Sequence, residues 1–99
     1  MGDTRIDRML QENRERILRL AGQRGARNVR VFGSVARGEA GERSDVDFLI
    51  DPEPGYTLLS QAALVRELES LLGRPVEVAS ARGLRRSILE HVLREAVPL

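Results

Sequence analysis

Apolar positions recur at helical spacing in three segments of the chain. Within residues 4–23 they follow every three or four positions, opposite a face rich in Arg, Glu and Gln. Thr4 can cap the start of this helix, and Gly25 can end it. The same spacing predicts a second helix over residues 57–72 and a last helix over residues 84–96.

Three shorter segments have the pattern of strands. Residues 28–32 are short and rich in valine, and residues 75–79 have a similar composition. Residues 45–50 alternate between a face that carries two aspartates and an apolar face, which is typical of a half-buried strand. The intervening segment 33–44 contains three glycines and is predicted to form a turn with one short helical piece.

The predicted element order is α-β-β-α-β-α, which indicates an α+β fold. We expect a small mixed sheet of about three strands, packed on one face by helices. The second and third strands are joined by a helix, so they should be parallel with a right-handed crossover if they pair directly. No repeat or linker divides the 99 residues, so we expect one domain over residues 1–99.

Composition narrows the possible functions. The hydrophobic fraction of 41% and charged fraction of 31% are typical of a soluble globular domain. No apolar run is long enough to span a bilayer, and neither a signal peptide nor a cysteine is present, so we expect a cytoplasmic protein without a thiolate metal site. A net charge of +1 and 3% aromatic residues argue against a dedicated nucleic-acid surface.

Asp45 and Asp47 are the first candidate site residues. Two positions apart on a strand, their side chains point to the same face. Two carboxylates so close repel each other unless a cation lies between them. Mg²⁺ prefers a few carboxylate oxygens together with waters and substrate phosphates, so the pair is a candidate magnesium site.

Gly33 and Ser34 form a candidate phosphate cradle directly after the first predicted strand. Glycine lets a phosphate approach the backbone closely, amides at a helix start favour anions, and a serine hydroxyl can donate to a phosphate oxygen. The cradle and the acidic pair lie at the two ends of one short connection. A metal ion on Asp45 and Asp47 could therefore bridge the phosphates that the cradle holds.

Neighbouring residues have roles that the sequence leaves open. Arg37 either reaches a phosphate or pairs with Glu39 or Glu42 to shape the loop. Ser44 either caps the following strand or belongs to a plain turn. Gly38 is expected to supply an unusual backbone angle.

The residues 33–38 (GSVARG), followed by 44–50 (SDVDFLI), resemble the signature of the DNA polymerase β-like nucleotidyltransferase superfamily. The chain is most similar to the minimal nucleotidyltransferases, the MNT antitoxins that are paired with HEPN toxins. The resemblance covers most of the chain, including the crossover helix and the ending 88–99.

This resemblance implies a third carboxylate on the next strand, where Glu77 stands. Members usually carry Asp there, and a misplacement of about 1 Å can cost ~10²-fold in rate, so this departure bears on catalytic efficiency. The alternative is that Glu77 is an ordinary exposed strand acid.

The resemblance also implies an activity: transfer of AMP from ATP, with Mg²⁺, to a tyrosine hydroxyl of a HEPN toxin. Neutralisation by occlusion alone and transfer to another acceptor remain alternatives. Arg82, Arg85 and Arg86 form either a solvated helix face or a phosphate or toxin contact, and His91 is interpreted as a packing or surface residue. The implied site residues are Asp45, Asp47 and Glu77 for catalysis and metal, and Gly33, Ser34 and Arg37 for nucleotide.

Overall fold

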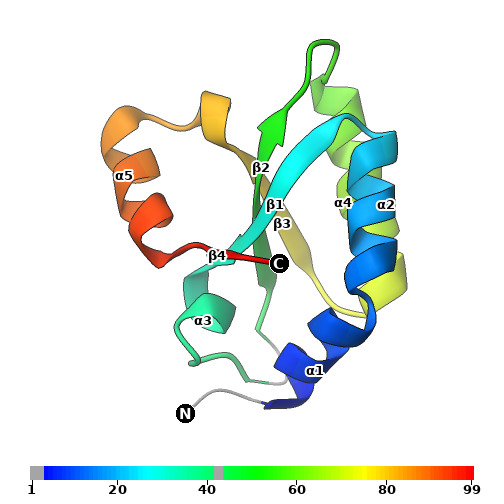
Figure 1. The fold of residues 1–99 in the computed structure, drawn as a ribbon, viewed down its shortest axis with the longest axis vertical. Coiled ribbons are helices and arrows are strands. Elements are labelled where there is room, and N and C mark those ends of the chain that lie inside the picture. The colour runs from blue at the N-terminus through cyan, green and yellow to red at the C-terminus, as the bar shows by residue number, and fades with distance from the viewer. Residues whose placement is uncertain (1–3, 42–43) are drawn as a thin grey trace.

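A four-stranded mixed sheet forms the centre of the protein in the computed structural model, which describes residues 4–41 and 44–99. The strand order is β3-β2-β1-β4 (Figure 1). The strands are β1 (Ala26–Phe32), β2 (Val46–Pro52), β3 (Val76–Ser80) and β4 (Val97–Pro98). The helices are α1 (Thr4–Glu12), α2 (Arg14–Gln23), α3 (Gly33–Ala36), α4 (Leu58–Leu72), α5 (Arg86–Glu95) and the 3₁₀ turn η1 (Ala81–Gly83).

The predicted first helix is divided in two at Asn13. Its backbone is at φ −102° and ψ 7°, outside helical values, and its side-chain amide donates to the Met9 carbonyl at 2.8 Å. Asparagine competes in this way with the helical hydrogen bonds of the backbone, which explains the break between α1 and α2. The proposed Thr4 cap concerns a side chain outside the described part of the structure.

The chain ends in a strand that the sequence pattern did not predict. Helix α5 ends at Glu95, and Ala96 is extended at φ −64° and ψ 136°. Val97 precedes a proline, which disfavours helical backbone and directs the chain into β4 beside β1. Only two residues form this strand, too few to give a periodic signal.

Strand pairing places the predicted acids on neighbouring positions. β1 and β2 are antiparallel, with Phe32 opposite Asp47. β2 and β3 are parallel, as expected for a helical crossover, with Asp47 opposite Glu77. Phe32, Asp47 and Glu77 therefore form one row across three adjacent strands.

Helices α2 and α4 cover one face of the sheet (Figure 1). Phe48 of β2 points to this face and is fully buried together with Ile17 of α2 and Leu64 of α4. Thr57 begins α4 with a capping box completed by Ser60, which satisfies amides at the helix start. This layer is the helical packing that the sequence predicts.

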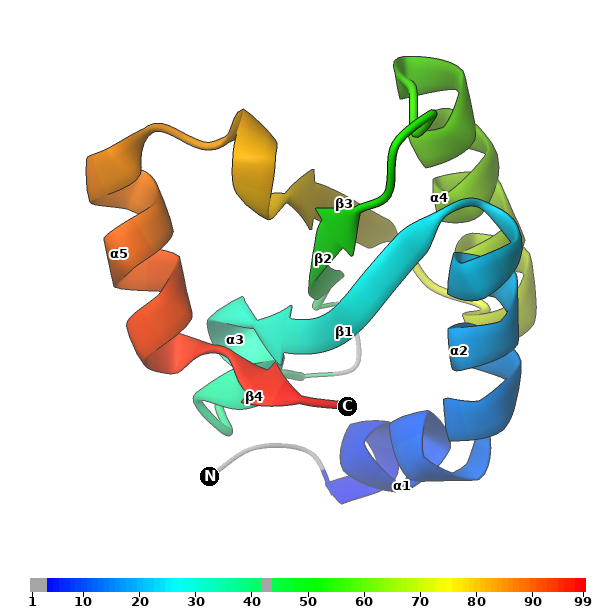
Figure 2. The same ribbon diagram turned by 45° about the horizontal axis from the view of Figure 1, so that its top comes forward.

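Helix α5 lies on the other side of the sheet from α2 and α4, as both ribbon views show (Figures 1 and 2). Leu49 and Val92 are buried but do not belong to the main core cluster. The sheet face that carries Asp47 and Glu77 is thus only partly covered. None of the helices in the described ranges is long and apolar enough to cross a membrane.

Candidate active site

The turn from β1 into α3 brings backbone against the carboxylate of Asp47. Gly33 has φ 73°, a left-handed conformation that favours glycine. A Cβ atom added there would overlap Oδ2 of Asp47 and lie 3.3 Å from its Cγ. Gly33 is therefore needed twice, for its backbone angle and for its close approach to the acid.

The loop after Gly33 is held by its own backbone. The Glu39 amide donates to the Ser34 carbonyl at 2.8 Å, and the Arg37 amide donates to the Gly33 carbonyl at 3.0 Å. Gly38 has φ 72°, which confirms the unusual backbone angle expected there. Gly33 and Ser34 are half-buried, in the first turn of a helix, where the amides have no partner within the helix.

Asp47 carries the strongest electrostatic perturbation of the site. Its pKa is raised from 3.8 to about 6, first by burial, then by a hydrogen bond with Glu77 and by the negative charges of Glu77 and Asp45. Arg37 acts in the opposite direction. The carboxylates are thus close enough to disfavour full ionisation without a cation between them.

The three acids differ in their exposure. Asp47 is half-buried, whereas Asp45 and Glu77 are exposed. Among residues 4–41 and 44–99, no three His, Cys, Asp or Glu side chains converge into a ready-made metal cage. Mg²⁺ commonly uses one or two carboxylates together with waters and phosphates, so a cage is not required, and the repulsion around Asp47 fits a divalent cation.

Arg37 joins the loop to helix α5. Its Nε donates to Glu39 at 3.0 Å, and its Nη1 donates to both carboxylate oxygens of Glu95 at 3.1 and 3.2 Å. The pairing with Glu39 agrees with the loop-shaping alternative, while Glu42 lies outside the described residues. The sequence did not indicate Glu95, because the contact spans 58 positions.

Ser44 belongs to a turn just before Asp45. Its hydroxyl accepts from the Gly41 amide at 2.9 Å, and its own amide donates to the Gly41 carbonyl at 3.1 Å. The guanidinium of Arg74 donates to the Ser44 carbonyl at 3.4 Å. These contacts support the turn interpretation and hold the start of β2.

An apolar slot of about 200 Å³ opens beside Glu77, between β3 and α5. Its lining comes from the end of β1, from β3, and from Leu84 and helix α5. The lining residues are Phe32, Glu77, Val78, Ala79, Leu84, Ile88 and Val92. From sequence, Ile88 and Val92 were only the apolar side of a helix, because no local pattern shows that α5 faces an acid.

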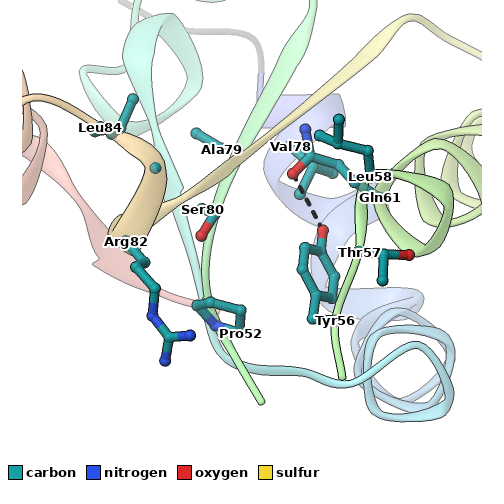
Figure 3. Close-up of a pocket in the computed structure, with 11 residues that line it drawn as sticks. Pro52, Tyr56, Thr57, Leu58, Gln61, Val78, Ala79, Ser80, Arg82 and Leu84 are labelled. Carbon is teal, nitrogen blue, oxygen red and sulfur yellow. Dashed lines mark hydrogen bonds between the residues drawn. The ribbon is translucent and has the colours of Figure 1, made fainter. Parts of the chain in front are cut away.

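A larger pocket of about 550 Å³ lies toward the other end of β2 and β3 (Figure 3). Tyr56 donates there to Gln61 Oε1 at 3.3 Å, and Arg82 lies on the wall. Burial raises the pKa of Tyr56. None of the described residues that line this pocket is acidic.

The remaining basic candidates lie at the surface. Arg82, Arg85 and Arg86 are exposed, and Arg86 pairs only loosely with Glu90, at 3.8 Å. His91 is 68% exposed and lies 3.7 Å from Glu95, which agrees with a surface residue.

Similar proteins share both the fold and the sequence of this chain. The family profile described as the nucleotidyltransferase domain matches residues 10–97. The protein adenylyltransferase MntA of Thermococcus cleftensis is 47% identical over 73 residues, which is 74% of this chain and 74% of the relative.

Solved structures of other proteins are also similar to this chain. A structure provisionally described as a minimal nucleotidyltransferase has a TM-score of 0.85 and 53% identity, over 93% of this chain and 94% of the other. An MNT antitoxin solved with a tri-AMPylated HEPN toxin of Shewanella oneidensis has a TM-score of 0.69, over 89% of this chain and 69% of the other; at 18% identity this shows the shared fold. On the family match and the two closely similar relatives, the chain belongs to the nucleotidyltransferase domain family, as one of its minimal members.

Proposed function

We propose that this protein is a Mg²⁺-dependent antitoxin that transfers AMP from ATP to a tyrosine hydroxyl of a HEPN toxin and so neutralises it. The observation that carries the proposal is the contact of the Gly33 backbone with Asp47, in register with Glu77. The proposed phosphate-binding turn is thereby adjacent to the acids Asp47 and Glu77. The relatives support the acceptor class, since one is named a protein adenylyltransferase and another was solved with an AMPylated toxin.

The turn binds the triphosphate in this proposal. Gly33 leaves room for the β- and γ-phosphates, and the first amides of α3 together with the Ser34 hydroxyl donate to their oxygens. Arg37, three positions after Ser34, donates to the same phosphates in this proposal once it leaves its carboxylate partners.

The acids bind the Mg²⁺ ion and accept the proton of the attacking hydroxyl in this proposal. Asp45 and Asp47, with Glu77 beside them, would bind Mg²⁺, which when bound neutralises charge on the phosphates. Glu77 is exposed and can accept the proton of the attacking hydroxyl. The phenol oxygen forms a bond to the α-phosphorus, the bond from that phosphorus to the bridging oxygen breaks, and pyrophosphate leaves toward Gly33.

A labelling experiment tests the proposal. The purified protein is incubated with its HEPN partner, MgCl₂ and ATP labelled at the α-phosphate, and the labelled residue is mapped by mass spectrometry. We expect label on a toxin tyrosine, and its loss in the double variant Asp45→Asn, Asp47→Asn or with EDTA. Undiminished labelling by the double variant would refute the assignment of the acids.

Neutralisation by occlusion is the second candidate. It is favoured by the exposed Glu77, which replaces the aspartate that members usually carry. Protection of the toxin's target by an equimolar amount of the Asp45→Asn, Asp47→Asn variant, without ATP, would support occlusion over transfer.

A further inference from the structure

The crossover unit β2-α4-β3 has a pocket at the end where both of its strands stop. Pro52 ends β2 and Ser80 ends β3, and both residues line the pocket of about 550 Å³ (Figure 3). The start of α4 adds Thr57 and Leu58 to the lining. In open sheets with parallel strands, ligands bind outside the carboxyl ends of the strands. The pocket therefore lies where a strand-helix-strand unit binds its ligand.

The proposed acids lie at the opposite end of the same two strands. Asp47 is the second residue of β2, and Glu77 is the second residue of β3. Ser80 lies three positions after Glu77, which is about 10 Å along a strand. The residues that the structure describes around the pocket include no acid. The pocket is therefore separate from the acids, and the proposed function leaves it without a role.

The pocket suits a small organic ligand in size and in the character of its walls. Its volume lies within the ~300–1,000 Å³ that is typical of pockets for such ligands. Tyr56 and Gln61 lie on one side of it and Arg82 on the other (Figure 3). A flat ring can bury its faces against the apolar part of this wall. The apolar lining residues are Pro52, Leu58, Val78, Ala79 and Leu84.

Polar side chains of the pocket have donors that the protein itself does not use. The Tyr56 hydroxyl donates to Oε1 of Gln61 at 3.3 Å, which leaves the amide N–H groups of Gln61 available. Within residues 4–41 and 44–99, the side chains of Ser80 and Arg82 make no hydrogen bond or ion pair. A fatty acid would match only the arginine, whereas a nucleotide offers ring nitrogens, hydroxyls and a phosphate to all three side chains.

We propose that this pocket binds a nucleoside monophosphate, with the base on the apolar wall beside Tyr56 and the phosphate at Arg82. The inference does not rest on the proposed function, and the site needs no Mg²⁺. It also separates the basic cluster found in the sequence, because Arg82 lines the pocket whereas Arg85 and Arg86 do not. Arg82 is exposed, so burial of the base supplies most of the affinity and the charge a smaller part.

The first measurement is a titration of the full chain with AMP in EDTA, followed by NMR. Tyr56 is the single tyrosine of the chain, so its ring signals report directly on the pocket. We expect saturable shifts of the Tyr56 ring and of the Gln61 side-chain amide, weaker binding of adenosine, and none of inorganic phosphate alone. Shifts confined to Gly33 and Ser34, no shifts at all, or adenosine binding as tight as that of AMP would overturn the proposal.

Two matched pairs of exposed residues test the walls without disturbing the core. Arg82→Gln should weaken AMP binding up to about fivefold and leave adenosine binding unchanged. Arg86→Gln removes the same charge outside the pocket and should change neither. Leu58→Ala should weaken the binding of both ligands about tenfold. Leu59→Ala should change neither, because Leu59 is 83% exposed against 84% for Leu58 but does not line the pocket.

Equal losses in both members of either pair would overturn the proposal, because the effect would then not come from the pocket wall. The double variant Asp45→Asn, Asp47→Asn should bind AMP as the unchanged protein does, and loss of binding there would assign the shifts to the acidic site instead. A second copy of the chain is the rival occupant, since Leu58 and Leu59 are exposed apolar neighbours. Dimerisation in sedimentation that Leu58→Ala abolishes and AMP leaves unchanged would assign the pocket to that contact and overturn the proposal.

Discussion

Replacement of Gly33 by alanine tests the central geometry of the site. The added Cβ overlaps Oδ2 of Asp47, and the next atom, Cγ, is only 3.3 Å away. Either the carboxylate or the turn has to move, so the proposed phosphate cradle and the proposed metal ligand move apart.

The size of the effect has two parts. Alanine at φ 73° costs about 1–2 kcal/mol of folding stability, from the strain of a left-handed backbone. Relief of the overlap displaces Asp47 by about 1 Å, and a misplacement of that size costs ~10²-fold in rate. We therefore expect a modest loss of stability with a large loss of transfer.

The variant Gly73→Ala separates the effect of backbone strain on stability from the effect of the displaced Asp47 on activity. Gly73 has φ 68°, and a Cβ there meets nothing within 4 Å, so it carries the strain without the collision. The assay measures urea unfolding and the initial rate of AMP labelling for both variants. If Gly33→Ala and Gly73→Ala lose stability equally and both keep full activity, the close approach of the turn to Asp47 has no role in catalysis.

Three further variants test the acids and the arginine. Because the folded pKa of Asp47, about 6, exceeds its ordinary 3.8, its contribution to stability is fully present below 3.8 and is lost as pH rises through 6. In EDTA, Asp47→Asn should thus be more stable than the unchanged protein at pH 7.5, by at most about 3 kcal/mol at about 1.4 kcal/mol per pKa unit, and this advantage should disappear near pH 4 in urea unfolding. If this advantage in stability is the same at both pH values, the pKa of Asp47 is not raised by burial and by the hydrogen bond with Glu77. Glu77→Asp should raise kcat, by up to ~10²-fold, if the longer side chain misplaces its carboxylate; a slower initial rate of labelling shows that glutamate is the fitted length. Glu95→Gln should tighten ATP binding, by up to about fivefold in calorimetry, because it releases Arg37 toward the phosphates, whereas weaker binding assigns Arg37 to the loop alone.

The site was predictable from sequence where it depends on local pattern. The alternation of polar and apolar residues around Asp47 predicts that it lies on a strand and that it points to the polar face. Gly33 directly follows a valine-rich strand. The family resemblance implied a third acid at Glu77, and the parallel pairing expected for a helical crossover places Glu77 opposite Asp47.

Features that depend on distant contacts were not predictable. β1 begins at Ala26 rather than at 28, with a register shift between Arg27 and Arg30 where Asn28 adopts φ 52°. Asparagine tolerates this backbone, but only the pairing with β2 shows that the strand continues past it. The tie between Arg37 and Glu95, and the side of the sheet that α5 covers, likewise arise from packing between elements far apart in the chain.

The parallel pairing of β2 and β3 has a consequence for assembly of the protein. Gly33 and Asp47 come together through a short connection, but Glu77 arrives only after α4 has crossed over and β3 has joined the sheet. During synthesis the turn at Gly33 and the aspartates therefore emerge from the ribosome before Glu77 does. The proposed set of three acids is complete only when β3 has paired with β2, and β4 joins the sheet later still.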